Sequence, residues 1–133
     1  MTDQGKKPKI LLVDDLEDVL AVLRKLFAAY ELFEARNAKA ALDLAASQKP
    51  DIVILDVHLP DMSGVDVMEK LALMRPNPVV IMVTGDSSIE TAGKSLAAGV
   101  FAHITKPFAA DELLEQVRKG LAFAEKEKRK RTP

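Results

Sequence analysis

Five short segments rich in apolar and β-branched residues alternate with stretches whose apolar residues recur at helical spacing. This alternation limits the fold more than any other feature, because strands that alternate with helices form parallel sheets. The pattern of one strand followed by one helix repeats five times. The predicted strands are Lys9–Val13, Glu31–Ala35, Asp51–Leu55, Pro78–Val83 and Ala102–Thr105.

The apolar content of each strand predicts its place in the sheet. Ile10–Val13, Ile52–Leu55 and Val79–Val83 are almost continuously apolar, as expected of parallel strands covered by helices on both faces. The other two strands are less apolar and are expected at the edges. Right-handed crossovers then predict a doubly wound, flavodoxin-like (βα)5 sheet of the α/β class with strand order 2-1-3-4-5.

Between the strands, apolar residues three and four positions apart predict five helices. The fourth is predicted to be weakly held, because its apolar stripe is small and Thr91, Gly93 and Ser95 are poor helix formers. We expect it to be the element that rearranges in any switch, within the region from Ser87 to Phe108. The stripes are Leu16 to Phe27, Ala41 to Ala45, Val65 to Ala72, Ile89 to Leu96 and Leu113 to Leu121.

The chain has 133 residues, which fits one domain with a single core. We assign the domain to residues 9–123, after a tail of residues 1–8. Residues 124–133 form a basic extension of the last helix or the start of a linker. The absence of cysteine excludes disulfides and thiolate metal sites. Without a signal peptide or an apolar run long enough to span a membrane, the expected location is the cytoplasm.

The net charge of −1 hides basic ends on an acidic body. Residues 10–124 carry 11 bases and 17 acids, a charge near −6, whereas the last turns around Lys126 to Arg131 are basic. A basic end can attract phosphates or anionic lipid. A short exposed run of charge is more often a solvated tail. We therefore expect no membrane partner and no direct binding of nucleic acid.

Reactive side chains follow four of the predicted strands. Asp14 and Asp15 follow the first strand, Asp56 the third, Thr84 the fourth and Lys106 the fifth. In the predicted order these strands are neighbours, and open parallel sheets bind ligands beyond the carboxyl ends of their strands. The sequence thus predicts that three carboxylates, a hydroxyl and an ammonium group meet in one pocket.

Three ionised carboxylates in one pocket repel each other, which favours a hard divalent cation such as Mg²⁺. An aspartate beside Mg²⁺ and Lys106 is suited to attack a phosphoryl donor and become an acyl phosphate. Each residue has a simpler interpretation: Asp15 as a helix cap, Thr84 as a turn cap, Lys106 as a surface lysine. Because all of these would have to coincide at one sheet edge, we favour the functional interpretation.

Four motifs carry a resemblance to a known family: KILLVDD, DIVILDVHLPDMSG, VVIMVTG and HITKPF, in this order from Lys9 to Phe108. On these motifs the chain resembles the receiver domains of bacterial two-component response regulators, and its last helix extends the likeness to about Phe123. The resemblance implies that Asp56 accepts a phosphoryl group from a histidine kinase or phosphotransfer protein. The implied Mg²⁺ ligands are Asp14 through water, Asp15, Asp56 and the backbone carbonyl of His58, and the implied phosphoryl contacts are Thr84 and Lys106.

The resemblance also implies a switch that couples Thr84 to the residue three positions before Lys106. The family usually has Tyr or Phe there, but this chain has His103, which we expect at the surface. His58 and Asp86 follow Asp56 and Thr84 by two residues, near the path of attacking water, and are expected to set the dephosphorylation rate. Whether Asp86 repels or orients that water stays open. The resemblance further implies that the Lys106-Pro107 bond is often cis.

The predicted function is a phosphorylation-dependent switch whose fourth helix and fifth strand control a downstream protein or output domain. The protein would catalyse only its own phosphorylation and dephosphorylation. Whether it forms a phosphorylation-dependent homodimer is left open. The alternative is a Mg²⁺-dependent phosphohydrolase on the same scaffold, but such enzymes need a second aspartate where His58 stands. A flavin-binding module is a further alternative, although the DDLED loop is acidic rather than a phosphate cradle.

Overall fold

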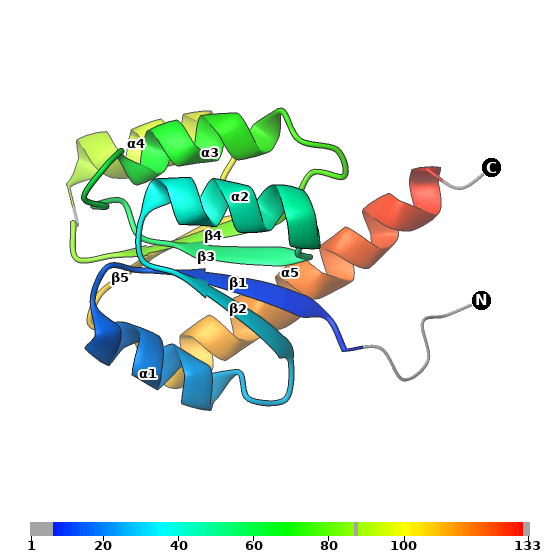
Figure 1. Cartoon of the computed structure of the whole chain (residues 1–133), viewed down its shortest axis with the longest axis horizontal. Helices are drawn as coiled ribbons and strands as arrows, with labels where there is room; N and C mark the ends of the chain where they lie inside the picture. Colours follow the sequence, from blue (N-terminus) through cyan, green and yellow to red (C-terminus); the bar gives the residue numbers. More distant parts are fainter. Residues whose placement is uncertain (1–6, 87, 132–133) are drawn as a thin grey trace.

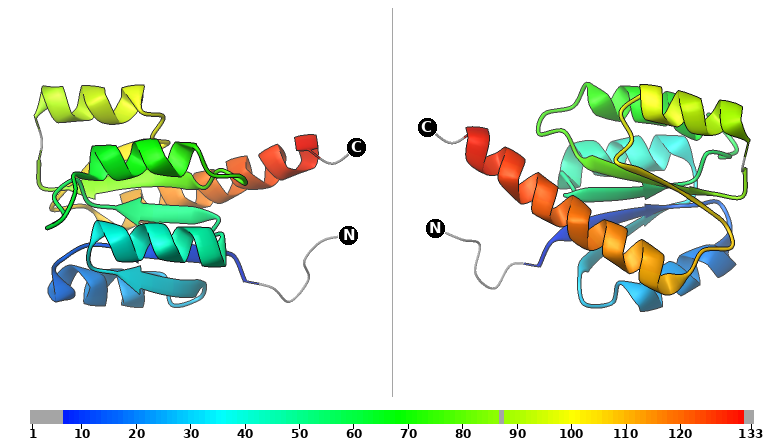
Figure 2. Two further views of the ribbon diagram at one scale, coloured as in Figure 1. Left: turned by 45° about the horizontal axis from the view of Figure 1, so that its top comes forward. Right: turned by 180° about the vertical axis from the view of Figure 1, so that it is seen from behind.

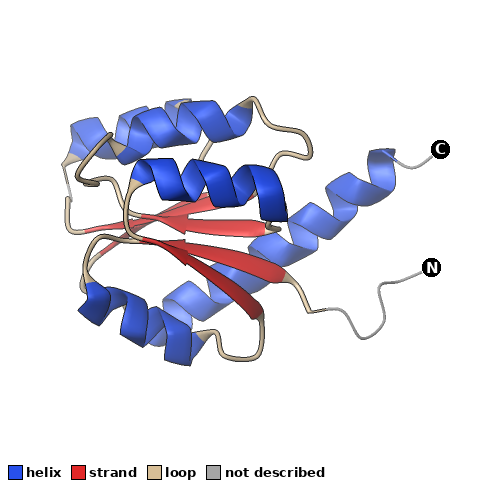
Figure 3. Ribbon diagram, viewed as in Figure 1, coloured by secondary structure: helices blue, strands red, loops and turns tan. Residues whose placement is uncertain are grey.

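The computed structural model describes residues 7–86 and 88–131. Five parallel strands form one sheet of order β2-β1-β3-β4-β5 between two layers of helices (Figures 1 and 3), which confirms the predicted flavodoxin-like fold. The elements are β1 (Lys9–Val13), α1 (Glu17–Leu26), β2 (Glu31–Ala35), α2 (Ala38–Gln48), β3 (Ile52–Leu55), α3 (Gly64–Ala72), β4 (Val79–Thr84), α4 (Ile89–Ala97), β5 (Ala102–Thr105) and α5 (Ala110–Arg131).

The two faces of the sheet bury two separate apolar clusters. Along β1, Leu11 and Val13 pack toward the layer of α2 and α3, whereas Ile10 and Leu12 pack toward α1 and α5. Every residue of β3 and β4 is buried, while β2 and β5 at the edges are partly exposed. Burial on both faces is the physical reason for the continuous apolar runs of the central strands.

Three strand boundaries, one in β3 and two in β4, differ from the predicted ones by one residue. β3 begins at Ile52 rather than Asp51, and β4 covers Val79–Thr84 rather than starting at Pro78, which has no N–H to donate to a neighbouring strand. Thr84 belongs to β4 because it pairs with Thr105 of β5, and its carbonyl accepts the Lys106 N–H at 2.8 Å.

Three of the predicted apolar stripes contain residues that are in fact exposed, and in the last of these stripes Leu114 is 37% exposed. Leu16 is the N-cap of α1 and 55% exposed, so the buried face of that helix begins at Leu20. On α4, Ile89 is 90% and Leu96 62% exposed, whereas Ser95 is buried and its hydroxyl donates to the Thr91 carbonyl at 3.0 Å. The predicted α4 stripe was wrong because this helix packs through small residues beside α3 (Figure 2).

α5 runs without interruption from Ala110 to Arg131 and extends beyond the edge of the sheet (Figures 1 and 2). Gly120 is buried where this helix crosses the sheet. A Cβ atom there would lie 2.9 Å from Ile52 Cδ1 and 3.2 Å from Val79 Cγ1, so the glycine permits a close approach of helix and sheet. Within the described ranges, no helix combines the length and the apolar character needed to cross a membrane.

Candidate functional site

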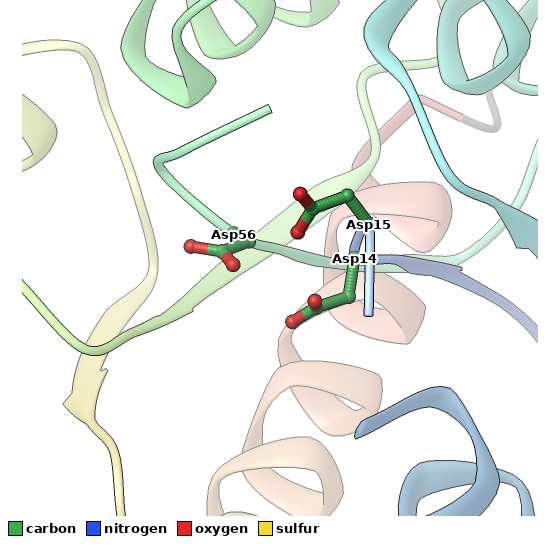
Figure 4. A group of neighbouring side chains, drawn as sticks. All are labelled: Asp14, Asp15 and Asp56. Carbon is green, nitrogen blue, oxygen red and sulfur yellow. The ribbon is translucent and has the colours of Figure 1, made fainter. Parts of the chain in front are cut away.

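Three aspartates gather at the carboxyl ends of β1 and β3. One carboxylate oxygen from each of Asp14, Asp15 and Asp56 lies within 4.8 Å of the others, and Figure 4 shows the three groups around one space. The sheet ladder continues into this region, because the Asp56 N–H donates to the Val13 carbonyl at 3.1 Å. The backbone of the central strands therefore positions the acidic cluster.

Lys106 reaches the same cluster from the loop after β5. Its Nζ lies 2.7 Å from Asp14 Oδ2 and 3.2 Å from Asp56 Oδ2, and its side chain is only 19% exposed. It is therefore not an ordinary surface lysine. The Lys106-Pro107 peptide bond is cis.

The charges at this site are not balanced by the protein alone. Burial raises the pKa of the Asp14 carboxyl, and the charge of Asp56 raises it further, outweighing the hydrogen bonds from Lys106 and the Leu16 N–H. Burial by itself would lower the pKa of Lys106, but its hydrogen bond with Asp14 and the charges of both aspartates raise it. The Lys106 ammonium group, in contact with Asp14 and Asp56, is thus held firmly in its charged form, while the three carboxylates together keep an excess of negative charge.

This donor set fits a hard divalent cation. Three carboxylate oxygens within 4.8 Å of one another, two of them from buried residues, can contribute to an oxygen coordination shell. The α1 N-cap is Leu16, without a side-chain cap, so the interpretation of Asp15 as a helix cap is wrong. Among the described residues, the Asp15 carboxylate makes no hydrogen bond or ion pair that would compete with a cation, although its backbone carbonyl accepts from Arg36 Nη2 at 3.2 Å.

Thr84, Asp86 and His58 form the rim of the site. Thr84 is fully buried, and its hydroxyl oxygen accepts the Asp86 N–H at 3.2 Å, so it also caps that turn. His58 Nε2 lies 3.3 Å from Asp86 Oδ2, which joins the loop after β3 to the loop after β4. Hydrogen bonds from the backbone and side chain of Ser88 and from the Thr91 hydroxyl lower the pKa of Asp86 to about 2, with a smaller contribution from His58.

His103 is not the surface residue that we expected. The residue is partly buried in β5, and its Nε2 is buried without a hydrogen-bond partner in the described part of the chain. It pairs with Met82 of β4, two residues before Thr84. α4 contacts β5, so this edge strand is partly covered.

Two residues that support the site were not predicted. A Cβ atom on Gly64 would clash with the Asp56 carbonyl oxygen and lie 2.6 Å from Val57 Cα, so only glycine allows α3 to begin here. Asp61 accepts the N–H groups of Ala38 and Lys39 at 2.7 and 3.1 Å, which ties the loop after β3 to the start of α2. The sequence DMSG contained the signal, since glycine after a serine N-cap marks a tight helix start.

The sequence profile described as "Response regulator receiver domain" matches residues 10–118 of the chain. Sporulation initiation phosphotransferase F of Bacillus subtilis (strain 168) is 33% identical over 115 residues, covering 85% of this chain and 93% of that protein. The probable transcriptional regulatory protein TcrX of Mycobacterium tuberculosis (strain ATCC 25618 / H37Rv) is 38% identical over 117 residues, covering 86% of this chain. The alignment covers only 50% of TcrX, so the chain spans about half the length of that relative.

Solved structures agree with these sequence relatives. A CheY-like response regulator receiver domain protein from Methanospirillum hungatei JF-1 superposes with a TM-score of 0.87 at 35% sequence identity. The superposition covers 92% of this chain and 99% of that one. The likeness therefore extends over most of the chain.

Proposed function

The chain belongs to the response regulator receiver domain family, and from this premise we propose that it is a phosphorylation-dependent switch in a two-component phosphorelay. Receiver domains are typically phosphoacceptors rather than enzymes that turn over a separate substrate. A histidine kinase or phosphotransfer protein is the proposed donor, and a downstream protein or output domain the proposed receiver of the signal. The observation that carries the proposal is the contact of one partly buried ammonium group, Lys106, with both Asp14 and Asp56 at the edge of the sheet.

Asp56 is the proposed phosphoacceptor. It follows a central strand, its Oδ1 accepts the His58 N–H at 3.2 Å, and its Oδ2 lies 3.2 Å from Lys106. An Asp56 oxygen would attack the phosphorus of a phosphohistidine, forming a P–O bond as the P–N bond breaks. The imidazole nitrogen of the donor takes the electron pair and a proton.

The surrounding residues stabilise the charge of the transferred group. Lys106 is in place to neutralise a phosphoryl oxygen, and the Thr84 hydroxyl, whose oxygen accepts the Asp86 N–H, can donate its own proton to another. Bound Mg²⁺ would supply further positive charge against the phosphoryl oxygens. Asp15, Asp56 and the backbone carbonyl of His58 would hold the ion directly, and Asp14 through water.

The phosphotransfer proposal is tested by incubating the protein with Mg²⁺ and acetyl phosphate. We expect one acid-stable, base-labile phosphate for each chain, abolished by Asp56→Asn and unchanged by Asp66→Asn, which alters an exposed aspartate of α3. Mass spectrometry measures the gain of the phosphoryl group. Labelling of Asp56→Asn at the rate of the unaltered protein would contradict the assignment.

His58 and Asp86 are proposed to set the lifetime of the phosphoryl group. Their 3.3 Å contact spans two loops at the rim, and the Asp86 oxygens are already engaged by Ser88, Thr91 and His58. These contacts hold the carboxylate in one orientation, and the His58 ring restricts access to the phosphoryl group. This arrangement favours slow hydrolysis.

We expect His58→Ala to shorten the lifetime of phosphorylated Asp56, because it removes the ring and releases Asp86. The measurement is the loss of protein-bound phosphate after the donor has been removed. Asp66→Asn serves again as the control outside the rim. A lifetime unchanged or lengthened in His58→Ala would contradict the proposed role.

The same residues connect the site to the surface. Movement of Thr84 toward the phosphoryl group would displace the loop after β4, to which Asp86 ties the first turn of α4. His103 lies in β5 beside Met82 and would respond to the same shift. Thr84 and His103 are thus the proposed switch residues, and α4 with β5 the proposed output surface.

A further inference from the structure

A second pocket lies at the opposite edge of the sheet from the acidic cluster. It has a volume of about 610 Å³ and is lined by residues at the starts of β3 and β4, by the segment before β5 and by α5. This volume lies within the range of roughly 300–1,000 Å³ that is usual for small-molecule sites. No residue of the phosphorylation site contributes to it.

The path of α5 creates this pocket. The helix passes close to the sheet at Gly120. Its later turns, which include Lys128, continue to Arg131, and the helix extends past the sheet edge (Figure 2). Lys128 Nζ contacts Asp51 Oδ1 at 2.7 Å and so holds these turns beside the start of β3. The pocket is therefore bounded by ordered elements on both sides.

The walls favour a flat apolar ligand. Phe101 and Phe123 lie with ring centroids 5.6 Å apart and planes inclined by 43°, and Phe123 is 46% exposed. Pro50 and Pro78 add ring carbons and no N–H donors. An aromatic ring placed against the phenylalanines would bury their exposed faces in offset or edge-to-face contact.

The charges of the lining residues favour an anion. Asp51 is already satisfied, because its Oδ2 accepts the Lys9 N–H at 2.9 Å and its Oδ1 contacts Lys128. Glu127 is paired with Lys130 at 3.3 Å. Lys49 also lines the pocket, and its ammonium group makes no ion pair or hydrogen bond with any residue in the described ranges. Lys49 therefore contributes a positive charge to the pocket that no described residue neutralises.

We propose that this pocket binds a small planar aromatic carboxylate, with the ring against Phe101 and Phe123 and the carboxylate near Lys49. The site is separate from the phosphoacceptor and needs neither Mg²⁺ nor Asp56. Its failure would leave the proposed phosphorelay function intact.

The proposal is tested by titrating the full chain with 1-naphthoate in the absence of Mg²⁺ and recording ¹H–¹⁵N NMR spectra. We expect saturable shifts centred on Asn77, Gly99, Phe101 and Phe123, both in the unaltered protein and in Asp56→Asn. The neutral analogue 1-naphthamide should bind the same residues more weakly. Shifts confined to the acidic cluster, or no saturable shift at millimolar naphthoate, would overturn the proposal.

Three variants separate the contributions. Phe123→Ala should weaken the binding of both probes about tenfold, since it removes one aromatic wall. Lys49→Gln should weaken naphthoate binding about threefold and leave naphthamide binding unchanged, as expected for an exposed charge. Val22→Ala, which alters an exposed residue of α1 outside the pocket, should change neither.

If Val22→Ala weakened binding as much as Phe123→Ala does, the assignment to this pocket would be overturned. Circular dichroism of Phe123→Ala tests whether its loss of binding comes from unfolding. If Phe123→Ala does unfold, the comparison of naphthoate with naphthamide binding in Lys49→Gln remains decisive. Pocket shifts that depend on protein concentration and not on naphthoate would assign the pocket to a second copy of the chain and overturn the proposal.

Discussion

Gly64 illustrates how one residue connects the fold to the site. It begins α3, and its N–H donates to the Val57 carbonyl at 2.6 Å, directly after Asp56. An added Cβ would meet backbone atoms of Asp56 and Val57, which cannot move without displacing the phosphoacceptor. Glycine is required at this position because there is no room for a Cβ atom, not because the backbone angle is unusual.

We expect Gly64→Ala to lower the free energy of unfolding by about 3 kcal/mol, the upper part of the range for overpacked interiors. Gly93→Ala is the matched control, because no atom lies within 4 Å of the Cβ that it adds on exposed α4. It should raise the free energy of unfolding by up to about 1 kcal/mol through helix propensity. Urea denaturation measures both, and changes of the same sign in the two variants would contradict this explanation.

At the scale of elements, α4 is the helix that the core holds least. Ser95 is its buried residue, whereas Ile89 and Leu96 face solvent. Its first turn depends on the Ser88 cap, whose hydroxyl accepts the Thr91 N–H at 3.1 Å, and on the contact between the Thr91 hydroxyl and Asp86. A helix with few buried apolar contacts can shift at a small free-energy cost.

We therefore expect α4 and its flanking loops to respond most to a phosphoryl mimic. On adding beryllofluoride with Mg²⁺, amide hydrogen exchange should change most between residues 88 and 108, because Asp86 joins this region to the site. Ser87, where the expected region starts, lies outside the described residues. Mass spectrometry of peptic fragments measures the exchange, and Asp56→Asn is the control that should not respond. An unchanged profile in residues 88–108 would rule out this switch.

At the scale of the whole molecule, the acidic cluster opposes folding stability. Burial raises the pKa of Asp14 in the folded protein, so the folded state binds a proton there more tightly than the unfolded state does. This favours folding at low pH, and the advantage is lost as the pH rises through the raised pKa. At neutral pH without a cation, the ionised Asp14 therefore costs stability.

We expect Asp14→Asn to raise the free energy of unfolding at pH 7 in EDTA by about 1 kcal/mol, as is common when a functional charge is removed. The increase in the free energy of unfolding that Asp14→Asn produces should become smaller as the pH is lowered toward 4. Mg²⁺ should stabilise the unaltered protein more than the variant, because binding to the folded state alone adds stability. Glu69→Gln, an exposed acid of α3, should change little, and a loss of stability in Asp14→Asn would contradict the explanation.

Much of this molecule follows from local sequence. Continuous apolar runs identified β1, β3 and β4 as central strands, and parallel strands bring their carboxyl ends to one edge. The motifs that contain Asp56 and Lys106 could therefore be assigned to one site before any coordinates were known. These inferences succeed because hydrophobic periodicity and strand polarity are properties of the chain itself.

Other features depend on contacts between distant segments. The exposure of Ile89 and Leu96 reflects how α4 lies on its neighbours, and the partial burial of His103 reflects the cover over β5. The close approach at Gly120 and the second pocket require the packing of α5 against β3 and β4. The order of strands and the acidic site were determined by the sequence alone. Which face of α4 is buried was decided only by tertiary packing, because burial depends on the neighbours that surround a residue.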